Sequence, residues 1–143
     1  MAIPEPKRNS LFEKFLKMLE ITPIQTKQEQ KEICGLCKIG FDPDCLAYGA
    51  KEDGRLLGVS QFRIFGGYAV IFDLANADGA KDFEALAAAG GAALRFIHSC
   101  KVRQVFMKTN DEELAKALKF KKDRCGEYRL DLDDYFNSPC SAL

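Results

Sequence analysis

The segment from Tyr68 to Ile97 constrains the fold of this chain more than any other. An apolar run, Tyr68–Leu74, is followed by a polar turn, Ala75–Gly79, and then by a long alanine-rich stretch. In that stretch apolar residues recur at the i, i+3, i+4, i+7 spacing of one helix face, which predicts a single helix over Lys81–Ser99. A strand, a turn and a long amphipathic helix in this order predict a domain in which the helix packs on a sheet.

Three consecutive strands are predicted around this segment, over Leu46–Lys51, Arg55–Phe65 and Tyr68–Leu74. The first two strands are joined through Asp53-Gly54, a strong hairpin signal because both residues tolerate a positive φ. Gly66-Gly67 provides the same kind of turn before the third strand. The sequence therefore predicts an antiparallel meander of three strands.

The remaining elements alternate between helix and strand. They are helices over Leu11–Leu19 and from Thr26 to about Gly40, an edge strand over Glu20–Gln25, strands over Val102–Lys108 and Glu127–Leu132, and a short helix after Asn110. The long helix is a crossover that permits parallel pairing of the strands on either side of it. We therefore expect an α/β fold (α+β in other conventions), with a mixed central sheet that contains the meander and is flanked by helices.

Length and composition indicate one globular domain. A chain of 143 residues buries roughly 70% of its unfolded surface, enough for a real core. We expect the domain to span residues 10–132, with tails at 1–9 and 133–143. Twenty-one basic residues balance 21 acidic ones, whereas nucleic-acid binding proteins have a basic excess. No apolar run reaches the length of a membrane span, and the N-terminus lacks the apolar region of a signal peptide. We therefore expect a cytoplasmic protein with no nucleic-acid or membrane partner.

The chain resembles the GNAT N-acetyltransferase superfamily over Glu20–Leu132. The segment AYGAKEDGRLLGVSQFRI, at 47–64, has the family's strand, charged tight turn and second strand containing Leu-Gly-Val. The strand, long helix, strand and short helix that follow are in family order, and Asn110–Phe120 is similar to the family's closing pattern. The resemblance implies that acetyl-CoA, or CoA, binds where the fourth and fifth strands separate.

The resemblance also implies which residues hold acetyl-CoA. Backbone amides at the end of the fourth strand are expected to bond to its pantetheine arm: Leu74, Ala75 and Asn76. The turn up to Gly79 is expected to cradle its phosphates, because we place the helix start there. Alternatively, Asn76 or Asp78 in this turn caps the helix. Asn110 matches the family's asparagine after the fifth strand.

The window Ala87–Ala92 corresponds to the family's phosphate-binding motif, Q/R-x-x-G-x-G/A. It has alanine in place of Gln or Arg, and its glycines, Gly90 and Gly91, lie inside the predicted helix. Amides inside a helix are already bonded, so close packing of the helix on the sheet competes with a contact to pyrophosphate.

Two residues are candidates for acid–base catalysis. Asp73 is the one acid of the third meander strand, which suits a general base that removes an amine proton. The structural alternative is a carboxylate that is solvated or paired with Arg63 or Lys51. The tyrosine that the family uses as an acid is absent from the closing helix, and Tyr128 could replace it. Its place among alternating apolar residues fits core packing equally.

The motif Cys34-Gly-Leu-Cys37 raises the possibility of thiol or zinc chemistry. A redox pair belongs at a helix N-terminus, where the dipole lowers the thiol pKa, but this pair is near the C-terminal end of its predicted helix. A zinc site needs four ligands, and the chain has one histidine and no second CxxC. We expect no metal, and six reduced cysteines used mainly as small apolar residues.

Two functions follow from the resemblance and the residues together. The first is an acetyl-CoA-dependent N-acetyltransferase whose acceptor is the amine of a small molecule or a peptide. The second is a GNAT-like domain that has lost catalysis and binds a ligand or a protein. The sequence leaves open whether the chain is a monomer or a homodimer.

Overall fold

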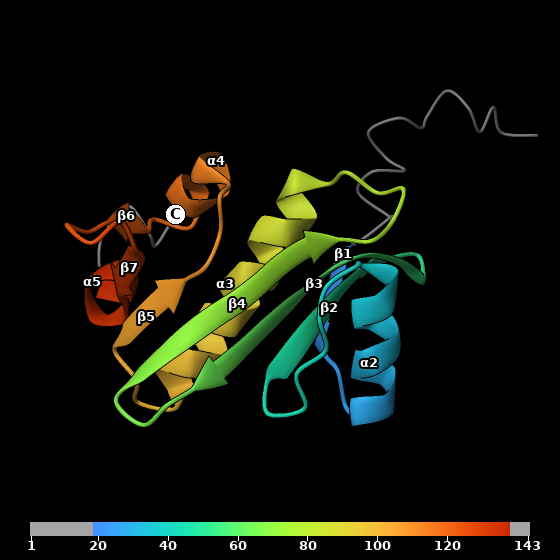
Figure 1. Ribbon diagram of the computed structural model, residues 1–143, viewed down its shortest axis with the longest axis horizontal. Helices are drawn as coiled ribbons and strands as arrows, with labels where there is room; N and C mark the ends of the chain where they lie inside the picture. The colour runs from blue at the N-terminus through green and yellow to red at the C-terminus, as the bar shows by residue number, and fades with distance from the viewer. Residues whose placement is uncertain (1–18, 138–143) are drawn as a thin grey trace, which may run out of the picture.

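The computed structural model describes residues 19–137 and places a mixed β-sheet between helices (Figure 1). The predicted N-terminal tail and the predicted helix over Leu11–Leu19 lie outside the described residues, except Leu19, which begins a strand. None of the helices within residues 19–137 is both long and apolar enough to cross a membrane.

The sheet has seven strands in the order β1-β2-β3-β4-β5-β7-β6. The strands are β1 (Leu19–Pro23), β2 (Leu46–Glu52), β3 (Arg55–Ile64), β4 (Tyr68–Asn76), β5 (Gln104–Met107), β6 (Lys121–Lys122) and β7 (Tyr128–Asp131). The β4–β5 pair is parallel and the other pairs are antiparallel. This arrangement confirms the predicted mixed sheet, the meander and the parallel crossover.

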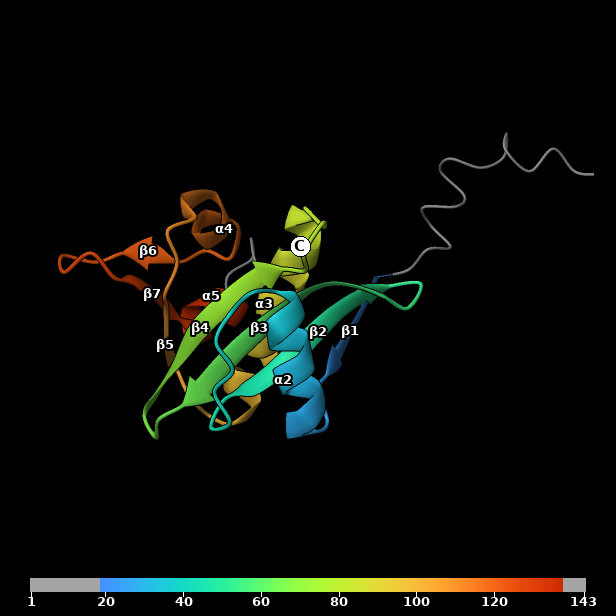
Figure 2. The same cartoon turned by 45° about the vertical axis from the view of Figure 1, so that its right-hand side comes forward.

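The helices are α2 (Lys27–Leu36), α3 (Phe83–Ser99), α4 (Glu112–Ala117) and α5 (Leu132–Asn137). Helices α2 and α3 cover opposite faces of the sheet, with α2 in front and α3 behind (Figure 2). Helix α5 occupies the start of the segment that we expected as a tail, and its Tyr135 and Phe136 pack against the main core. The two-residue strand β6 was not predicted.

Both predicted hairpins are present. Asp53 and Gly54 have φ values of 53° and 79°, and they form the two-residue turn between β2 and β3. At the next turn Gly66 has a φ of 77°, and the amide of Phe65 donates to the carbonyl of Tyr68 at 2.7 Å. These left-handed conformations cost glycine little, which explains why the turns were recognisable.

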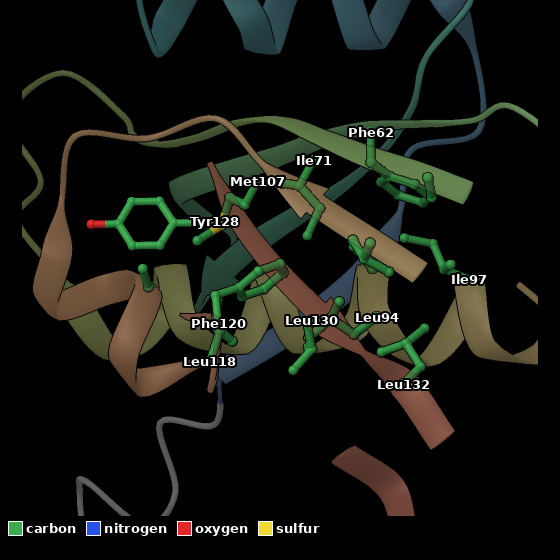
Figure 3. Close-up of a cluster of buried hydrophobic side chains, with 14 of the residues drawn as sticks. Phe62, Ile71, Leu94, Ile97, Met107, Leu118, Phe120, Tyr128, Leu130 and Leu132 are labelled. Atoms are coloured by element: carbon green, nitrogen blue, oxygen red, sulfur yellow. The ribbon is translucent and has the colours of Figure 1, made fainter. Parts of the chain in front are cut away.

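The main core lies between α3, α4 and the β3–β7 part of the sheet (Figure 3). Its largest fully buried side chains include Phe62, Ile71, Leu94 and Ile97. The apolar stripe that predicted α3 therefore faces the sheet. Burial of one such side chain stabilises a fold by roughly 1.5–3 kcal/mol, so α3 depends on the sheet rather than on helix propensity.

Gly90 lies inside α3, where the helix packs closely against the sheet and the C-cap of α4. A Cβ atom at Gly90 would lie 2.7 Å from Leu118 Cδ1 and 3.2 Å from Leu74 Cδ1. At Gly91 the nearest such atom is the terminal nitrogen of Arg95, at 3.5 Å. The geometry supports the packing interpretation of Gly90 and offers neither glycine a helix start.

The face covered by α2 has its own smaller core, which includes Ile33, Val59 and Cys37. Leu36 of this helix is 57% exposed, whereas Gln30 and Cys34 are buried. Burial raises the pKa of Cys34, with a further rise from the nearby Asp73 carboxylate. Burial likewise raises the pKa of Cys37 to about 11 and that of Cys45 to about 12.

These thiols are poor candidates for redox chemistry. Helix α2 ends at Leu36 and Cys37 is its C-cap, so the dipole does not favour a thiolate at the pair. Within residues 19–137 no cluster of His, Cys, Asp and Glu is arranged to hold a metal ion. The cysteines of this motif serve as small apolar residues under α2.

We predict opposite effects for alanine at the two adjacent glycines of α3. Gly91→Ala should stabilise the protein by roughly 0.5–1 kcal/mol, because alanine is the better helix former and its methyl group has room. Gly90→Ala should lose that gain, because forcing a methyl group against Leu118 costs about 1–3 kcal/mol. Urea unfolding of both variants measures the difference. Equal stabilisation by both would contradict close packing at Gly90.

We also predict that alkylation separates the cysteines by burial. With a pKa of about 11, roughly one Cys37 thiol in a thousand is ionised at pH 8, and its side chain is buried. Iodoacetamide at pH 8 should therefore modify the exposed Cys100 and Cys125 in the native protein. Cys34, Cys37 and Cys45 should react after unfolding in urea. Peptide mass mapping reads the sites, and rapid native labelling of Cys34 or Cys37 would reopen the thiol hypothesis.

Candidate active site

Strands β4 and β5 run together at one end and then separate. They pair over Tyr68–Ile71 of β4, and the amide of Lys108 donates to the carbonyl of Ile71 at 3.0 Å where the pairing ends. Strand β4 continues to Asn76, whereas β5 ends at Met107, and the two diverge in Figure 1. The second half of β4 is thus paired with β3 on one side and open toward β5 on the other.

A β-bulge marks the point of divergence. Gln61 of β3 is opposite Asp73, whereas the next residue, Phe62, is opposite Ile71, so Phe72 has no partner in β3. Such an extra residue bends its strand and increases the local twist. Ile71 contributes to the α3-side core, and the Asp73 carboxylate bonds to Gln61 on the α2 side.

The direction of the β4 amides decides which of them can meet a ligand. The amide of Ala77 donates to the carbonyl of Leu57 in β3, at 2.8 Å. Because successive amides of a strand point to opposite sides, Ala75 also points toward β3, and Leu74 and Asn76 point toward the gap. Of the three amides that the resemblance implied, two are therefore oriented to bond to a pantetheine arm.

The turn after β4 is not the start of the helix, which corrects our prediction. Helix α3 starts at Phe83, and its N-cap is Asp82, whose Oδ1 accepts from the amide of Ala85 at 3.0 Å. Neither Asn76 nor Asp78 is the cap. The Asn76 side chain instead donates to the carbonyls of Leu57 and Asp82, at 3.1 and 3.3 Å.

The same turn offers few free amides to a phosphate. The amide of Asp78 donates to the carbonyl of Leu36 at 3.0 Å, and that of Ala80 donates to Ala77 at 2.9 Å. Gly79, with a φ of 84°, is exposed at the tip of the turn. The nearby acids Asp82 and Glu84 add negative charge at the helix start. This end of the site therefore fits a pyrophosphate poorly.

Asp73 is half-buried and is held by a hydrogen bond rather than by an ion pair. Its Oδ2 accepts from Gln61 Nε2 at 2.9 Å. Arg63 is one of the two cations that the structural alternative named as a partner of Asp73. Its Nη1 lies 3.7 Å from Asp44 Oδ2 instead. Among residues 19–137 the second oxygen, Oδ1, accepts no hydrogen bond, so it is available to a ligand in the site.

Tyr128 is not brought together with Asp73. It lies in β7 opposite Met107, is 8% exposed, and belongs to the α3-side core. Its hydroxyl points away from the apolar cluster in Figure 3. Strand β5 stands between β7 and β4, and the two side chains face opposite sides of the sheet. The core interpretation of Tyr128 is therefore the better one.

Asn110, the last predicted site residue, is exposed in the loop between β5 and α4. The short helix that follows is capped by Asp111, whose Oδ1 accepts from the amide of Leu114 at 3.0 Å. Asn110 itself is not the cap of this helix. Nothing in the loop brings the Asn110 side chain into contact with Asp73.

Sequence reasoning missed two residues of the site, Gln61 and Gln30. Each is 1% exposed, and their side chains bond to each other at 2.9 Å. A signal was present for Gln61, because it lies with Ser60 between the apolar residues Val59 and Phe62 of a predicted strand. A buried amide needs hydrogen-bond partners, so such a position indicates a polar network.

Comparisons with known proteins agree with this geometry. No family model matches the chain, and no curated protein is similar to it in sequence. Among solved structures, the spermidine/spermine N-acetyltransferase SpeG from Vibrio cholerae has a TM-score of 0.66 at 10% identity, over 85% of this chain and 99% of that one. A GNAT family acetyltransferase from Brucella melitensis, in complex with acetyl-CoA, has a TM-score of 0.63 at 12% identity, over 80% and 88%.

A third solved structure, the PaiA N-acetyltransferase from Thermoplasma acidophilum in complex with coenzyme A, has a TM-score of 0.62 at 10% identity and covers 80% of this chain and 99% of its own. Likeness at such low identity concerns the fold. The separation of β4 and β5 and the matching solved structures lead to one conclusion. This chain has the fold of the GNAT N-acetyltransferases.

Proposed function

We propose that this chain is an acetyl-CoA-dependent N-acetyltransferase whose reaction takes place in the gap between β4 and β5. The observation that carries the proposal is the separation of these strands beyond Ile71, which leaves one edge of β4 open over Phe72–Asn76. Three of the structures with this fold were solved with acetyl-CoA or coenzyme A. The acceptor is the amine of a small molecule or a peptide.

The backbone of β4 would hold the pantetheine arm. The amides of Leu74 and Asn76 point toward the gap, and a β-strand edge is a ready partner for amide groups of an extended ligand. Acetyl-CoA supplies an acetyl group activated as a thioester. The protein's part is to place an amine beside that group and to exclude competing water.

Asp73 would act as the general base. Its Oδ2 is held by Gln61, and its Oδ1 is available to accept a proton from an ammonium or amine acceptor. The bulge at Phe72 places this carboxylate at the point where the strands separate. No residue of the described chain is assigned as the acid, because Tyr128 faces the other side of the sheet.

A specific observation favours a second candidate, a GNAT-like binding domain without catalysis. The start of α3 has carboxylates at Asp82 and Glu84, and Asp82 bonds to the amide of Ala85. Asp78, in the preceding turn, is paired with Lys38 at 3.6 Å and adds little to this charge. A helix start of this kind repels phosphate. A domain that no longer binds acetyl-CoA would not need a phosphate-binding helix start.

The first test of the proposal is binding of acetyl-CoA by isothermal titration calorimetry. We expect measurable affinity, and we expect Asp82→Ser to strengthen it roughly fivefold, because one charge at ~4 Å in water is worth about 1 kcal/mol. Serine can still cap the helix. Asp134→Ser, an exposed site on α5, is the matched control and should leave the affinity unchanged. Absence of binding at millimolar acetyl-CoA would reject the enzyme in favour of the binding domain.

The second test concerns Asp73. We expect Asp73→Asn to lower kcat by about 10²–10⁴, the usual contribution of a general base, with the affinity for acetyl-CoA preserved. CoA release should be followed with spermidine, a mixture of amino acids and peptides with a free amine as acceptors. Asp134→Asn is the matched control. Undiminished turnover by Asp73→Asn would remove Asp73 from the mechanism.

A further inference from the structure

A continuous chain of hydrogen bonds connects Lys27 at the start of α2 to Asp73 in β4. Lys27 Nζ donates to Gln30 Oε1 at 3.0 Å, and Gln30 Nε2 donates to Gln61 Oε1 at 2.9 Å. Gln61 Nε2 then donates to Asp73 Oδ2 at 2.9 Å. The chain thus runs from a cation, through two buried amides, to a carboxylate.

The two amides can take one orientation in this chain. The oxygen of Gln61 also accepts from the amide of Asp42 at 3.2 Å, and its nitrogen also donates to the carbonyl of Gly40 at 2.9 Å. The nitrogen of Gln30 donates in addition to the carbonyl of Cys45 at 3.2 Å. If either side-chain amide were flipped, its nitrogen would face another donor and its oxygen would face another acceptor in a buried site.

We infer that Gln61 and Gln30 are positioning residues that orient the Asp73 carboxylate toward the gap between β4 and β5. This inference rests on the proposed function, in which Asp73 is the base. Gln61 holds Oδ2, so rotation of the carboxylate is restricted and Oδ1 is left to accept from a ligand. Gln30 holds the oxygen of Gln61 and thereby keeps its nitrogen on Asp73.

The surroundings of the carboxylate support a positioning role. The Cys34 thiol donates to Gln61 Oε1 at 3.4 Å, and the Cys45 thiol also lies near Asp73. Burial raises the pKa values of both thiols, so both are neutral at neutral pH. Arg63 is engaged with Asp44. The orientation of Asp73 is therefore set by neutral amide dipoles, which hold a carboxylate without neutralising it.

A purely structural role predicts a different outcome and can be separated from this one. Gln61 also fixes the loop at Gly40 and Asp42 to the sheet, so a large change at Gln61 would destabilise the protein whether or not Asp73 is a base. Gln61→Met keeps the length of the side chain without adding a charge, and it removes the donor that faces Asp73. Gln30→Leu, one step further along the chain, is the second variant if Gln61→Met does not fold.

The kinetic test is a double-mutant cycle between Gln61 and Asp73. Gln61→Met should lower kcat at least tenfold with KM for acetyl-CoA unchanged within twofold. In the Asp73→Asn background the same change should have no further effect on kcat, because Gln61 acts through Asp73. Gln28→Leu, on the exposed side of α2, is the matched control and should retain full activity. Losses that multiply in the double variant would overturn the inference.

A second measurement does not depend on turnover. It tests the chain of hydrogen bonds separately from the proposed function. In ¹⁵N-labelled protein, Asp73→Asn should shift the side-chain amide signals of both Gln61 and Gln30, because the hydrogen bonds are coupled. The Gln28 signal, from an amide bonded to Glu32 on the surface, should not move. An unshifted Gln30 signal would show that Gln30 is not coupled to Asp73 and would overturn the inference. If the signals shift but the protein does not bind acetyl-CoA, the hydrogen bonds are coupled and the proposed function is wrong. The positioning role of the two glutamines is then wrong as well.

Discussion

The separation of β4 from β5 is the constraint on which the candidate site depends. A parallel pair whose hydrogen bonds continued to Asn76 would leave no open strand edge, and the core between α3 and the sheet would be closed there. One extra residue, Phe72, bends β4 away and lets the last amides of the strand face the gap. The bend has a second effect, because it places Ile71 in the main core and the Asp73 carboxylate on the opposite face.

The two ends of this gap differ in their chemistry. At the strand end, open amides and a held carboxylate suit an extended ligand and an amine. At the helix end, Asp82 already occupies the helix start and places charge where a phosphate would lie. Capping a helix with a carboxylate stabilises it by about 1 kcal/mol, which is favourable for the fold and unfavourable for anion binding. At Asp82, the stability of the helix and the binding of an anion are therefore opposed.

Most of the fold could be predicted because its signals are local. The 3.6-residue period specified α3, and two glycine turns specified the meander. The bulge at Phe72 leaves no local signal, because an apolar strand reads the same with one residue more or less. The helix start was misplaced for a related reason: Asn76, Asp78 and Asp82 are all good caps, and the path of the loop decides among them.

The site was harder to predict than the fold because its polar contacts join distant parts of the chain. Asp73 was recognisable as an isolated acid in an apolar strand, but its partner Gln61 lies on β3, and Gln30 lies on α2. Burying two side-chain amides costs several kcal/mol unless every donor and acceptor has a hydrogen-bond partner. Two buried glutamines are therefore tolerated where all of their hydrogen bonds are made. Here the pairing is complete only when a carboxylate, or another acceptor, stands at position 73. The buried glutamines and the candidate base are thus one structural unit.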